Sequence, residues 1–416
     1  MRPTRTLLAH GAAALSSLLE GTGPADETLS AYFRSQRQLG QHDRAFIAEA
    51  AFAVLRRKRS LEAAAGSAEP RALLAAALVR VFGLSGRALE GLMETSLLAR
   101  IRATDFAALP AAVRADLPDW LWERLASRHG VDEAMRIAQA LLSPAPLDLR
   151  VNLARIGRDE VLALLAKDGL AASATPYSPA GVRLAGKPAI NRHALFRDGL
   201  VEVQDEGSQL LAWLLAPRRR EMIADYCAGA GGKALAIAML TRGTGRIYAL
   251  DVSARRLQAL APRAARAGIT NIHPIALSGE NDARAKRLAG KLDRVLVDAP
   301  CSGFGTLRRN PDLKWRHGPE AIEELAHKQL RILRAASRLV RPGGRLVYAT
   351  CSILHEENDA VADAFQAADA EFRVLSCGAA FDEQRIALNT GERLRLWPHR
   401  HGTDGFFAAA FERAAQ

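Results

Sequence analysis

The chain has 416 residues, 49% of them hydrophobic, and no apolar run approaches the roughly 18 residues that a membrane-spanning helix needs. These values predict a soluble globular protein of two or three domains and exclude a membrane-spanning one. The net charge of +12 favours a polyanionic partner such as nucleic acid, although a genome that prefers arginine would also raise it.

The cysteines indicate the redox environment. Cys227, Cys301, Cys351 and Cys377 lie far apart in the sequence, and none of them forms a Cys-x-x-Cys pair. This spacing argues against a zinc site and against a disulfide framework. The first ten residues have only a short, polar-interrupted apolar stretch, which does not resemble a cleaved signal peptide. We therefore expect reduced thiols, no metal and a cytoplasmic location.

Residues 1–105 are expected to form a helical domain, because apolar residues recur there every three or four positions. Within 34–59, one face carries Phe46, Ile47 and Val54, and the segment ends in four basic residues, 56–59. Those cations either meet RNA phosphates or complement the C-terminus of a helix.

Residues 106–200 contain several prolines, and a small mixed α/β module fits them best. Asp119 opens a predicted helix, 147–152 alternates like a strand, 158–170 indicates a helix and 181–184 another strand.

From 201 to 416, strands and helices alternate, which is typical of a doubly wound parallel sheet. The strand 221–225 leads into a glycine-rich turn, 226–233, and a helix follows from about Lys233. The next strand, 246–251, ends in Asp251, about 20 residues beyond the loop. In this geometry a carboxylate holds the hydroxyl groups of a ribose.

The loop favours S-adenosylmethionine over NAD, because it is not Gly-x-Gly-x-x-Gly and is too compact to hold a pyrophosphate. Asp251 is expected to bind the ribose, and Lys233 and Asp225 the methionine end. Asp282 is expected to bind the adenine amino group, with Glu280 competing for that role; for each residue a helix cap or surface charge is the alternative. The expected cofactor contacts are Asp225, Cys227, Ala228, Gly229, Ala230, Gly231, Gly232, Lys233, Asp251, Arg256, Asp282 and Asp298.

Two further predicted strands end in cysteines. One is followed by Asp298-Ala-Pro-Cys-Ser-Gly303 and the other by Thr350-Cys-Ser352. Because ligands bind at the carboxyl ends of parallel strands, Asp298, Cys301 and Cys351 should converge on one pocket if the strands are neighbours.

Two thiols and an acid suit methylation of a pyrimidine carbon. C5 of cytosine is a poor nucleophile, and addition of a thiolate to C6 makes it electron-rich. A carboxyl group at N3, which Asp298 could supply, would assist that addition. One cysteine would attack and the other would help to release the product. Buried cysteines that serve only as small hydrophobic residues are the alternative.

These motifs resemble the Nop/Sun-type RNA 5-methylcytosine methyltransferases over about 145–411. The resemblance rests on 298–303, 348–352, 310–315, 203–209 and 404–407. It implies a Rossmann-like class I methyltransferase sheet, with Cys351 as the nucleophile and Cys301 as the releasing residue. The first domain is more loosely similar to the NusB-like domain of the bacterial 16S ribosomal RNA members, and the middle module to their RNA-binding extension.

One position departs from the family's pattern. Ala230 stands where proline is common, so the preset φ is lost while no contact is lost. Cofactor affinity is the property that this change puts in doubt.

A basic segment follows the first cysteine strand. We expect Arg308, Arg309 and Lys314 to pair with RNA phosphates, and Trp315 to pack within the loop in preference to stacking on a flipped base. The expected substrate is ribosomal RNA, at a cytosine in a loop or in partly unfolded RNA, and the protein is expected to be a monomer. The alternatives are a transfer RNA methyltransferase, a non-catalytic ribosome-assembly factor and a small-molecule methyltransferase.

Overall fold

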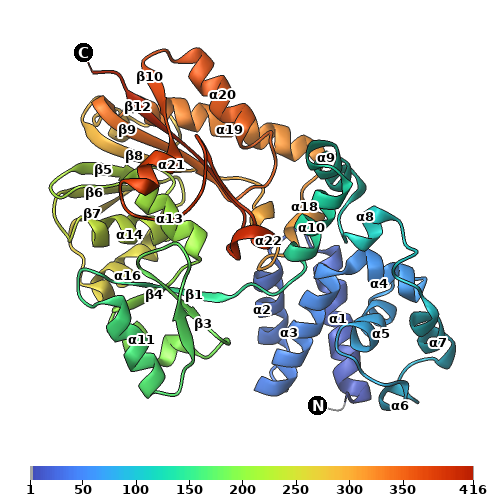
Figure 1. The fold of residues 1–416 in the computed structure, drawn as a ribbon. Coiled ribbons are helices and arrows are strands. Elements are labelled where there is room, and N and C mark those ends of the chain that lie inside the picture. Colours follow the sequence, from blue (N-terminus) through green and yellow to red (C-terminus); the bar gives the residue numbers. More distant parts are fainter. Residues whose placement is uncertain (1–2, 416) are drawn as a thin grey trace. The chain divides into compact units, whose positions relative to one another are not determined.

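The computed structural model describes residues 3–415, which divide into two compact units (Figure 1). The first unit comprises the chain up to Pro144 together with Thr306–Pro319, and the second comprises Ala145–Gly305 together with the chain from Glu320 onward. None of the helices in residues 3–415 combines the length and apolar character needed to cross a membrane.

The first unit is helical, as predicted. Helix α5 lies at its centre: residues 72–78 are all buried, and the helix contacts α1, α3, α4 and α7. A helix that is apolar all round needs such complete cover. The helices of this unit are α1 (Arg5–Glu20), α2 (Ala25–Ser35), α3 (Gln41–Arg56), α4 (Lys58–Ala65), α5 (Pro70–Arg80), α6 (Gly86–Leu89), α7 (Thr95–Ala103), α8 (Ala111–Arg114), α9 (Asp119–His129), α10 (Val131–Leu141) and α18 (Leu313–Arg316).

The helical unit extends past residue 105, where we expect a domain boundary, and that boundary stays a prediction. Helices α8, α9 and α10 belong to the helical unit, which continues to Pro144. One reason is Asp116, whose carboxylate accepts hydrogen bonds from the Ser60 N–H at 2.9 Å and hydroxyl at 2.7 Å. Pro110 and Pro118 precede helices of this unit, and the first strand within residues 3–415 is β1 (Leu147–Val151).

The second unit begins with a small antiparallel sheet in the order β2-β3-β1-β4. Its strands are β1, β2 (Ala172–Ala174), β3 (Gly181–Leu184) and β4 (Val201–Val203), with the helices α11 (Arg158–Lys167) and α12 (Ala194–Arg197) and the 3-10 turn η1 (Ile190–Arg192). The strands expected at 147–152 and 181–184 and the helix expected from 158 are confirmed.

The larger sheet has the order β10-β12-β9-β8-β5-β6-β7, and β11 pairs with β12. The strands from β9 to β7 are parallel, and β12 joins β9 antiparallel. The strands are β5 (Met222–Asp225), β6 (Arg246–Asp251), β7 (Ile272–Ala276), β8 (Leu292–Asp298), β9 (Val340–Thr350), β10 (Phe372–Leu375), β11 (Leu394–Leu396) and β12 (Phe406–Arg413).

Helices cover both faces of this sheet, which confirms the predicted Rossmann-like architecture. The alternation of side chains along β8 shows how: Leu296 belongs to the core formed with α14, whereas Val295 and Val297 belong to the core formed with α19. The remaining elements are α13 (Glu206–Leu215), α14 (Gly232–Leu240), α15 (Ala254–Gln258), α16 (Leu260–Ala267), α17 (Ala283–Lys286), η2 (Phe304–Thr306), α19 (Pro319–Ser337), α20 (Asp359–Ala368), α21 (Cys377–Asp382) and α22 (Pro398–His401).

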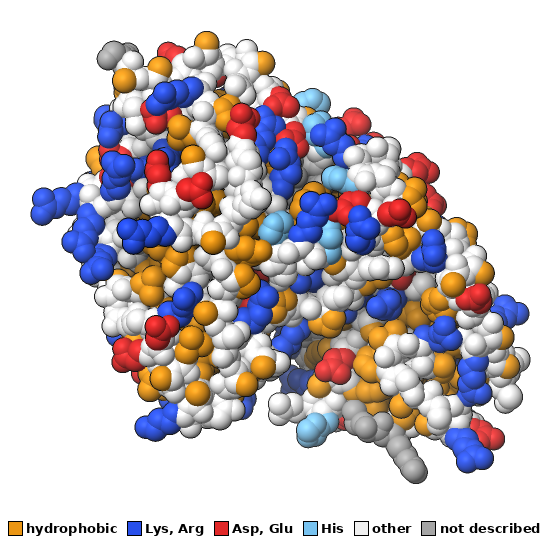
Figure 2. All heavy atoms as spheres, in the orientation of Figure 1, with side chains coloured by type: hydrophobic (Ala, Val, Ile, Leu, Met, Phe, Trp, Pro, Cys, Tyr) orange, Lys and Arg blue, Asp and Glu red, His pale blue; other side chains and the backbone are white. Residues whose placement is uncertain are grey.

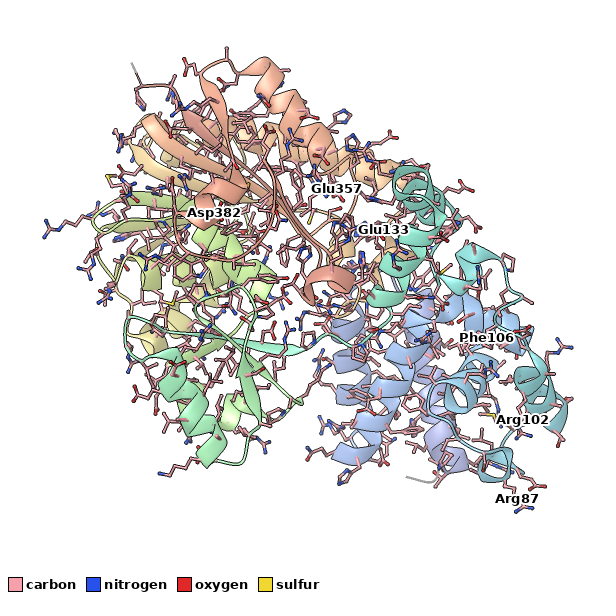
Figure 3. All side chains as sticks on the ribbon, viewed as in Figure 1. Arg87, Arg102, Phe106, Glu133, Glu357 and Asp382 are labelled. Atoms are coloured by element: carbon pink, nitrogen blue, oxygen red, sulfur yellow. The ribbon has the colours of Figure 1, made fainter. Side chains whose placement is uncertain are left out.

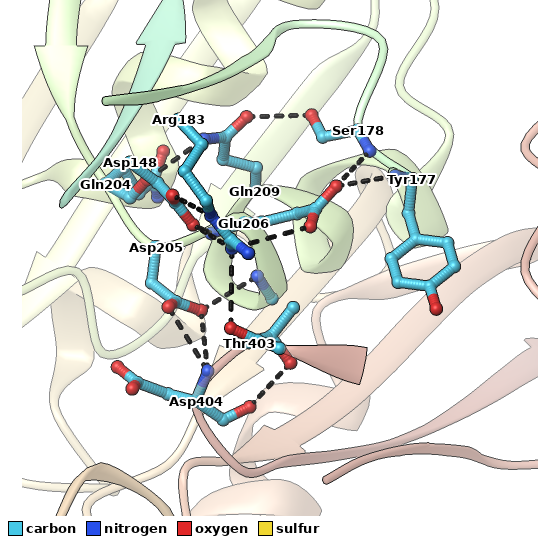
Figure 4. A network of polar contacts seen from close by, with 12 residues as sticks. Asp148, Tyr177, Ser178, Arg183, Gln204, Asp205, Glu206, Gln209, Thr403 and Asp404 are labelled. Atoms are coloured by element: carbon cyan, nitrogen blue, oxygen red, sulfur yellow. Dashed lines mark hydrogen bonds and ion pairs between the residues drawn. The ribbon is translucent and has the colours of Figure 1, made fainter. Parts of the chain in front are cut away.

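A buried polar network joins the small sheet to the large one (Figure 4). Arg183 of β3 donates to Asp148 of β1 at 2.7 Å, and Glu206 accepts from the Tyr177 N–H at 2.6 Å. Asp205 accepts from the backbone N–H of Asp404, just before β12, at 3.2 Å. The motifs at 203–209 and 404–407 therefore have a structural role, because they tie the two sheets together.

Candidate active site

The two cysteine strands are neighbours, as the sequence predicted. Strands β8 and β9 pair in parallel, with Asp298 opposite Ala349. Because both strands end at the same edge, Cys301 and Cys351 meet there, and their sulfur atoms lie 3.4 Å apart. Both side chains are half-buried, so each retains some access to solvent.

A cavity of about 460 Å³ opens beside the two thiols. Its wall combines the predicted catalytic residues with part of the predicted cofactor site: Cys227, Asp251, Arg256, Asp298, Cys301 and Cys351. A ligand in this cavity would therefore touch the glycine-loop side and the cysteine side at once.

The glycine-rich turn is shaped by close approaches that a side chain would block. Gly229 has φ +55°, and its N–H donates to Asp251 at 2.7 Å. Gly231 has φ +81°, and a Cβ there would lie 2.1 Å from a methyl group of Leu260. The carbonyl of Ala230 accepts from Arg263 at 2.6 Å. These contacts hold the turn in place although the proline common at position 230 is absent.

A buried cluster of charges lies behind the turn. Lys233 Nζ lies 2.6 Å from Asp298 Oδ2. Asp225 is fully buried, and within residues 3–415 its carboxylate oxygens have no well-formed hydrogen bond, although the backbone N–H of Ala234 acts on them. Burial and the negative charge of Asp298 raise the pKa of Asp225 to about 7, against the influence of Lys233. Asp225 is thus an unsatisfied acceptor for a cationic ligand group.

Asp282 lies at the predicted edge but is engaged as a helix cap. Its carboxylate accepts from Ser278 N–H at 2.7 Å and from Arg284 N–H at 2.8 Å, at the start of α17. Glu280 lines the cavity and pairs with Arg331 at 3.2 Å. The cap that we had considered as the alternative is present, and a contact between Asp282 and adenine stays a prediction.

The two thiols lie among charged groups. The hydrogen bond with Cys351, burial and the nearby Glu357 and Asp298 raise the pKa of Cys301 well above its ordinary value. Burial tends to lower the pKa of Lys233, but Asp298, Asp225 and Cys351 together raise it. Lys233 therefore interacts with Cys351, and two carboxylates lie near Cys301. No group of three or more His, Cys, Asp or Glu side chains in residues 3–415 could hold a metal ion.

The predicted RNA contacts lie in Thr306–Pro319, which we call the inserted segment, because it is part of the helical unit. Lys314 is 2% exposed and donates to the carbonyls of Arg56 at 2.8 Å and Asp116 at 2.6 Å. This burial does not fit a phosphate contact. Arg308 is also buried, Arg309 is half-buried, and their contacts with RNA stay predictions.

The predicted packing of Trp315 is confirmed. Its indole N–H donates to the carbonyl of Leu55 at 2.7 Å, and its ring packs against the core beneath α3. The basic run 56–59 is also engaged within this unit: Arg56 donates to the Arg308 carbonyl at 3.1 Å, and Arg59 pairs with Asp119 at 2.6 Å.

Sequence reasoning missed Glu357. It is fully buried and accepts hydrogen bonds from Ser302 and Ser352, the residues that directly follow the two cysteines. A signal was present in the sequence, because a serine follows each cysteine directly and Glu357 comes five residues after the second serine, Ser352.

Comparisons with known proteins identify the family. A family model described as 16S rRNA methyltransferase RsmB/F matches residues 212–412, and an RsmF/B-like ferredoxin-like domain matches 117–191. The ribosomal RNA small subunit methyltransferase B of Xanthomonas campestris is 32% identical over 90% of this chain and 90% of its own length. The chain belongs to the RsmB/F family. The probable ribosomal RNA small subunit methyltransferase B of Bacillus subtilis is 35% identical over 73% of this chain and 67% of its own length.

Solved structures share the RsmB/F fold. That of PH0851 has 25% identity and a TM-score of 0.77, covering 97% of this chain and 99% of the other. A methyltransferase homologue from Pyrococcus horikoshii has 28% identity and a TM-score of 0.63, covering 74% and 100%. NSun6 from the same organism, solved with SFG, has 22% identity and a TM-score of 0.63, covering 72% and 99%, and shows the fold alone. The resemblance to Sun-type methyltransferases is thereby confirmed.

Proposed function

We propose that this protein transfers a methyl group from S-adenosylmethionine to C5 of a cytosine in ribosomal RNA, through a covalent bond between Cys351 and C6. The observation that carries the proposal is the pair of thiols, 3.4 Å apart, on the wall of a cavity that Asp251 and Asp298 also line. The relatives named as small-subunit ribosomal RNA methyltransferases favour ribosomal RNA over transfer RNA.

The residues present fit S-adenosylmethionine. Asp225 offers an unsatisfied buried carboxylate to the ammonium of the methionine end, and the glycine turn leaves room for close backbone approach. Asp251 and Arg256 line the cavity where the ribose would lie. When bound, S-adenosylmethionine supplies a methyl group activated by a positive sulfur.

The chain's own residues would prepare the base. Cys351 adds through its sulfur to C6, and the electron pair moves through the ring so that C5 becomes nucleophilic. The pair of Asp298 and Lys233, 2.6 Å apart, supplies a proton to N3 through the Asp298 carboxyl group and so neutralises the negative charge that thiolate addition places on the ring. After methyl transfer, the C5 proton passes to Cys301 or to a base that Cys301 positions, the electron pair of that C–H bond re-forms the C5–C6 double bond, and Cys351 leaves as its thiolate. Cys301 lies close enough to assist this last step.

The division of roles between the thiols follows the family resemblance, with Cys351 as the nucleophile and Cys301 as the releasing residue. A nucleophilic cysteine acts as its thiolate, and a nearby cation favours that form. Lys233 is such a cation, because Cys351 is among the groups that raise its pKa.

The basic side chains that could bind RNA do not gather in one place. Lys and Arg side chains occur over both units on the face shown in Figure 2, interleaved with acidic side chains. A phosphate contact at the half-buried Arg309 belongs to this proposal, whereas the burial of Arg308 speaks against one there, as it does for Lys314. Because a base inside a helix is inaccessible, the target cytosine should lie in a loop or in partly unfolded RNA.

A nucleoside analysis tests the proposal. The protein is incubated with methyl-labelled S-adenosylmethionine and total RNA from a strain that lacks it, and the RNA is digested and analysed by mass spectrometry. Label in 5-methylcytidine from the small ribosomal subunit is expected. Label in another nucleoside, or none despite bound cofactor, would overturn the proposed chemistry.

A further inference from the structure

The loop after β9 buries a carboxylate beneath the two cysteines. Glu357 is 0% exposed and accepts four hydrogen bonds, all from neutral donors (Figure 3 labels this residue). They come from the Ser302 N–H at 2.8 Å, the Ser302 hydroxyl at 2.5 Å, the Ser352 hydroxyl at 2.5 Å and the Gln329 side-chain amide at 3.0 Å. One side chain thus bridges two chain segments that are 50 residues apart in sequence.

The bridged residues are the immediate neighbours of the thiols. Ser302 follows Cys301 and Ser352 follows Cys351, and the two serine hydroxyls lie 3.2 Å apart. The next residue, Asn358, continues the contact, because its side-chain amide donates to the Ser352 carbonyl at 3.1 Å. These contacts therefore hold the two cysteine-bearing loops together, and with them the two sulfur atoms.

The bridge is itself held in place. The Tyr348 hydroxyl of β9 donates to the Glu357 carbonyl at 2.5 Å, and Gln329 of α19 donates to the Pro300 carbonyl at 3.0 Å. A buried carboxylate is destabilising unless its acceptor sites are filled. Here three of the four donors belong to the serines that follow the cysteines, so the burial of charge is coupled to the geometry of the thiol pair.

We propose that Glu357 is a positioning residue that ties the two cysteine-bearing loops together and sets Cys301 against Cys351 for product release. The effect of Glu357 on product release rests on the proposed function. Its effect on the distance between the two thiols does not. Loss of the bridge would let the loops separate, and misplacement by about 1 Å can slow a reaction about 100-fold.

A crosslinking assay tests the geometry without RNA or cofactor. Diamide oxidises two neighbouring thiols to a disulfide and takes up the two hydrogens. The rate at which the Cys301–Cys351 disulfide forms is measured by peptide mass spectrometry, with Cys227 and Cys377 as internal references. Glu357→Ala should slow the disulfide about tenfold or more. Glu357→Gln keeps a planar bridge that can donate to the serine hydroxyls, and should stay within about threefold of wild type.

Two further variants keep the test decisive. Ser352→Ala removes one arm of the bridge and leaves the carboxylate in place, so it decides the question if Glu357→Ala does not fold. Glu206→Ala removes another fully buried carboxylate, which accepts from Tyr177 and Ser178, and controls for general loss of stability. Slowing in Glu357→Ala or Ser352→Ala but not in Glu206→Ala supports the assignment. Wild-type rates in folded Glu357→Ala and Ser352→Ala, or equal slowing in Glu206→Ala, would overturn it.

The catalytic arm separates this assignment from the proposed function. With RNA and cofactor, Ser352→Ala should bind S-adenosylhomocysteine as wild type does and release 5-methylcytidine about tenfold more slowly. A wild-type protein that forms no 5-methylcytidine would refute the proposed function while leaving the crosslinking result standing. Normal release by Ser352→Ala would overturn the positioning role.

Discussion

Replacing Lys314 by methionine tests whether the inserted segment is structural. The ammonium of Lys314 is buried against two backbone carbonyls, from Arg56 and Asp116. Burial, partly opposed by Asp116, lowers the pKa of Lys314 from 10.5 to about 7. Between these two pH values the unfolded chain binds a proton that the folded chain lacks, so the free energy of unfolding rises with pH.

The magnitude follows from the size of that shift. Each pH unit in this window changes the free energy of unfolding by at most about 1.4 kcal/mol. Between pH 7 and pH 9, the free energy of unfolding of the wild type should therefore rise by about 2 kcal/mol more than that of Lys314→Met. At lower pH, the Lys314→Met variant lacks two charge-assisted hydrogen bonds of the wild type, worth about 1.5–3 kcal/mol each, but it does not bury an ammonium group. The pH dependence is thus a cleaner test than the stability difference at a single pH.

Urea unfolding followed by circular dichroism at the two pH values measures this difference. Lys58→Met is the matched control, because it removes the same charge from a partly exposed side chain of the same unit. A stability difference that is equal at pH 7 and pH 9 would refute the reasoning. So would a fall in RNA affinity with a smaller dependence on salt, which is the mark of a lost phosphate contact.

Three more predictions concern the cofactor side of the cavity. Gly231→Ala should weaken binding of S-adenosylhomocysteine by about 1–3 kcal/mol, because φ is +81° there, whereas Gly186→Ala, which lies outside the turn and has nothing within 4 Å of the added Cβ, should bind normally; equal affinities by calorimetry would contradict this. Asp225→Asn should abolish a rise in cofactor affinity as pH increases through about 7, where Asp225 gains its charge, and an unchanged pH profile would assign the titration to another group. Lys233→Met should slow covalent attack on RNA about tenfold or more, because Lys233 lies 2.6 Å from Asp298, and a normal rate in single-turnover assays would remove Lys233 from the catalytic step.

The convergence of Cys301 and Cys351 could be predicted from sequence. Each cysteine follows a buried apolar strand, and parallel strands present their carboxyl ends at one edge. The same rule placed Asp251 beside the glycine turn, where it accepts from Gly229 at 2.7 Å. Which cysteine attacks could not be predicted from spacing, because both follow strand ends at the same edge of the sheet and their sulfur atoms lie 3.4 Å apart.

The fate of Lys314 could not be predicted from its neighbours. Cations beside an aromatic residue after a catalytic strand suggest RNA contacts, but the carbonyl of Arg56 that Lys314 binds is 258 residues away in sequence. The role of Asp282 was also open from sequence, because an acid after a strand can bind a ligand or cap the following helix. The structure shows that Asp282 caps α17. Local pattern identifies the residue type, and tertiary contacts decide its use.

The most direct test of the proposed chemistry identifies the atom that RNA is bonded to. The Cys301→Ala variant is incubated with ribosomal RNA and methyl-labelled S-adenosylmethionine, then treated with nuclease and protease, and the peptides are sequenced by mass spectrometry. The account predicts a stable adduct in which the peptide containing Cys351 carries a 5-methylcytidine nucleotide, and no adduct when Cys351→Ala is used. An adduct on another residue, or 5-methylcytidine formed by Cys351→Ala, would contradict it.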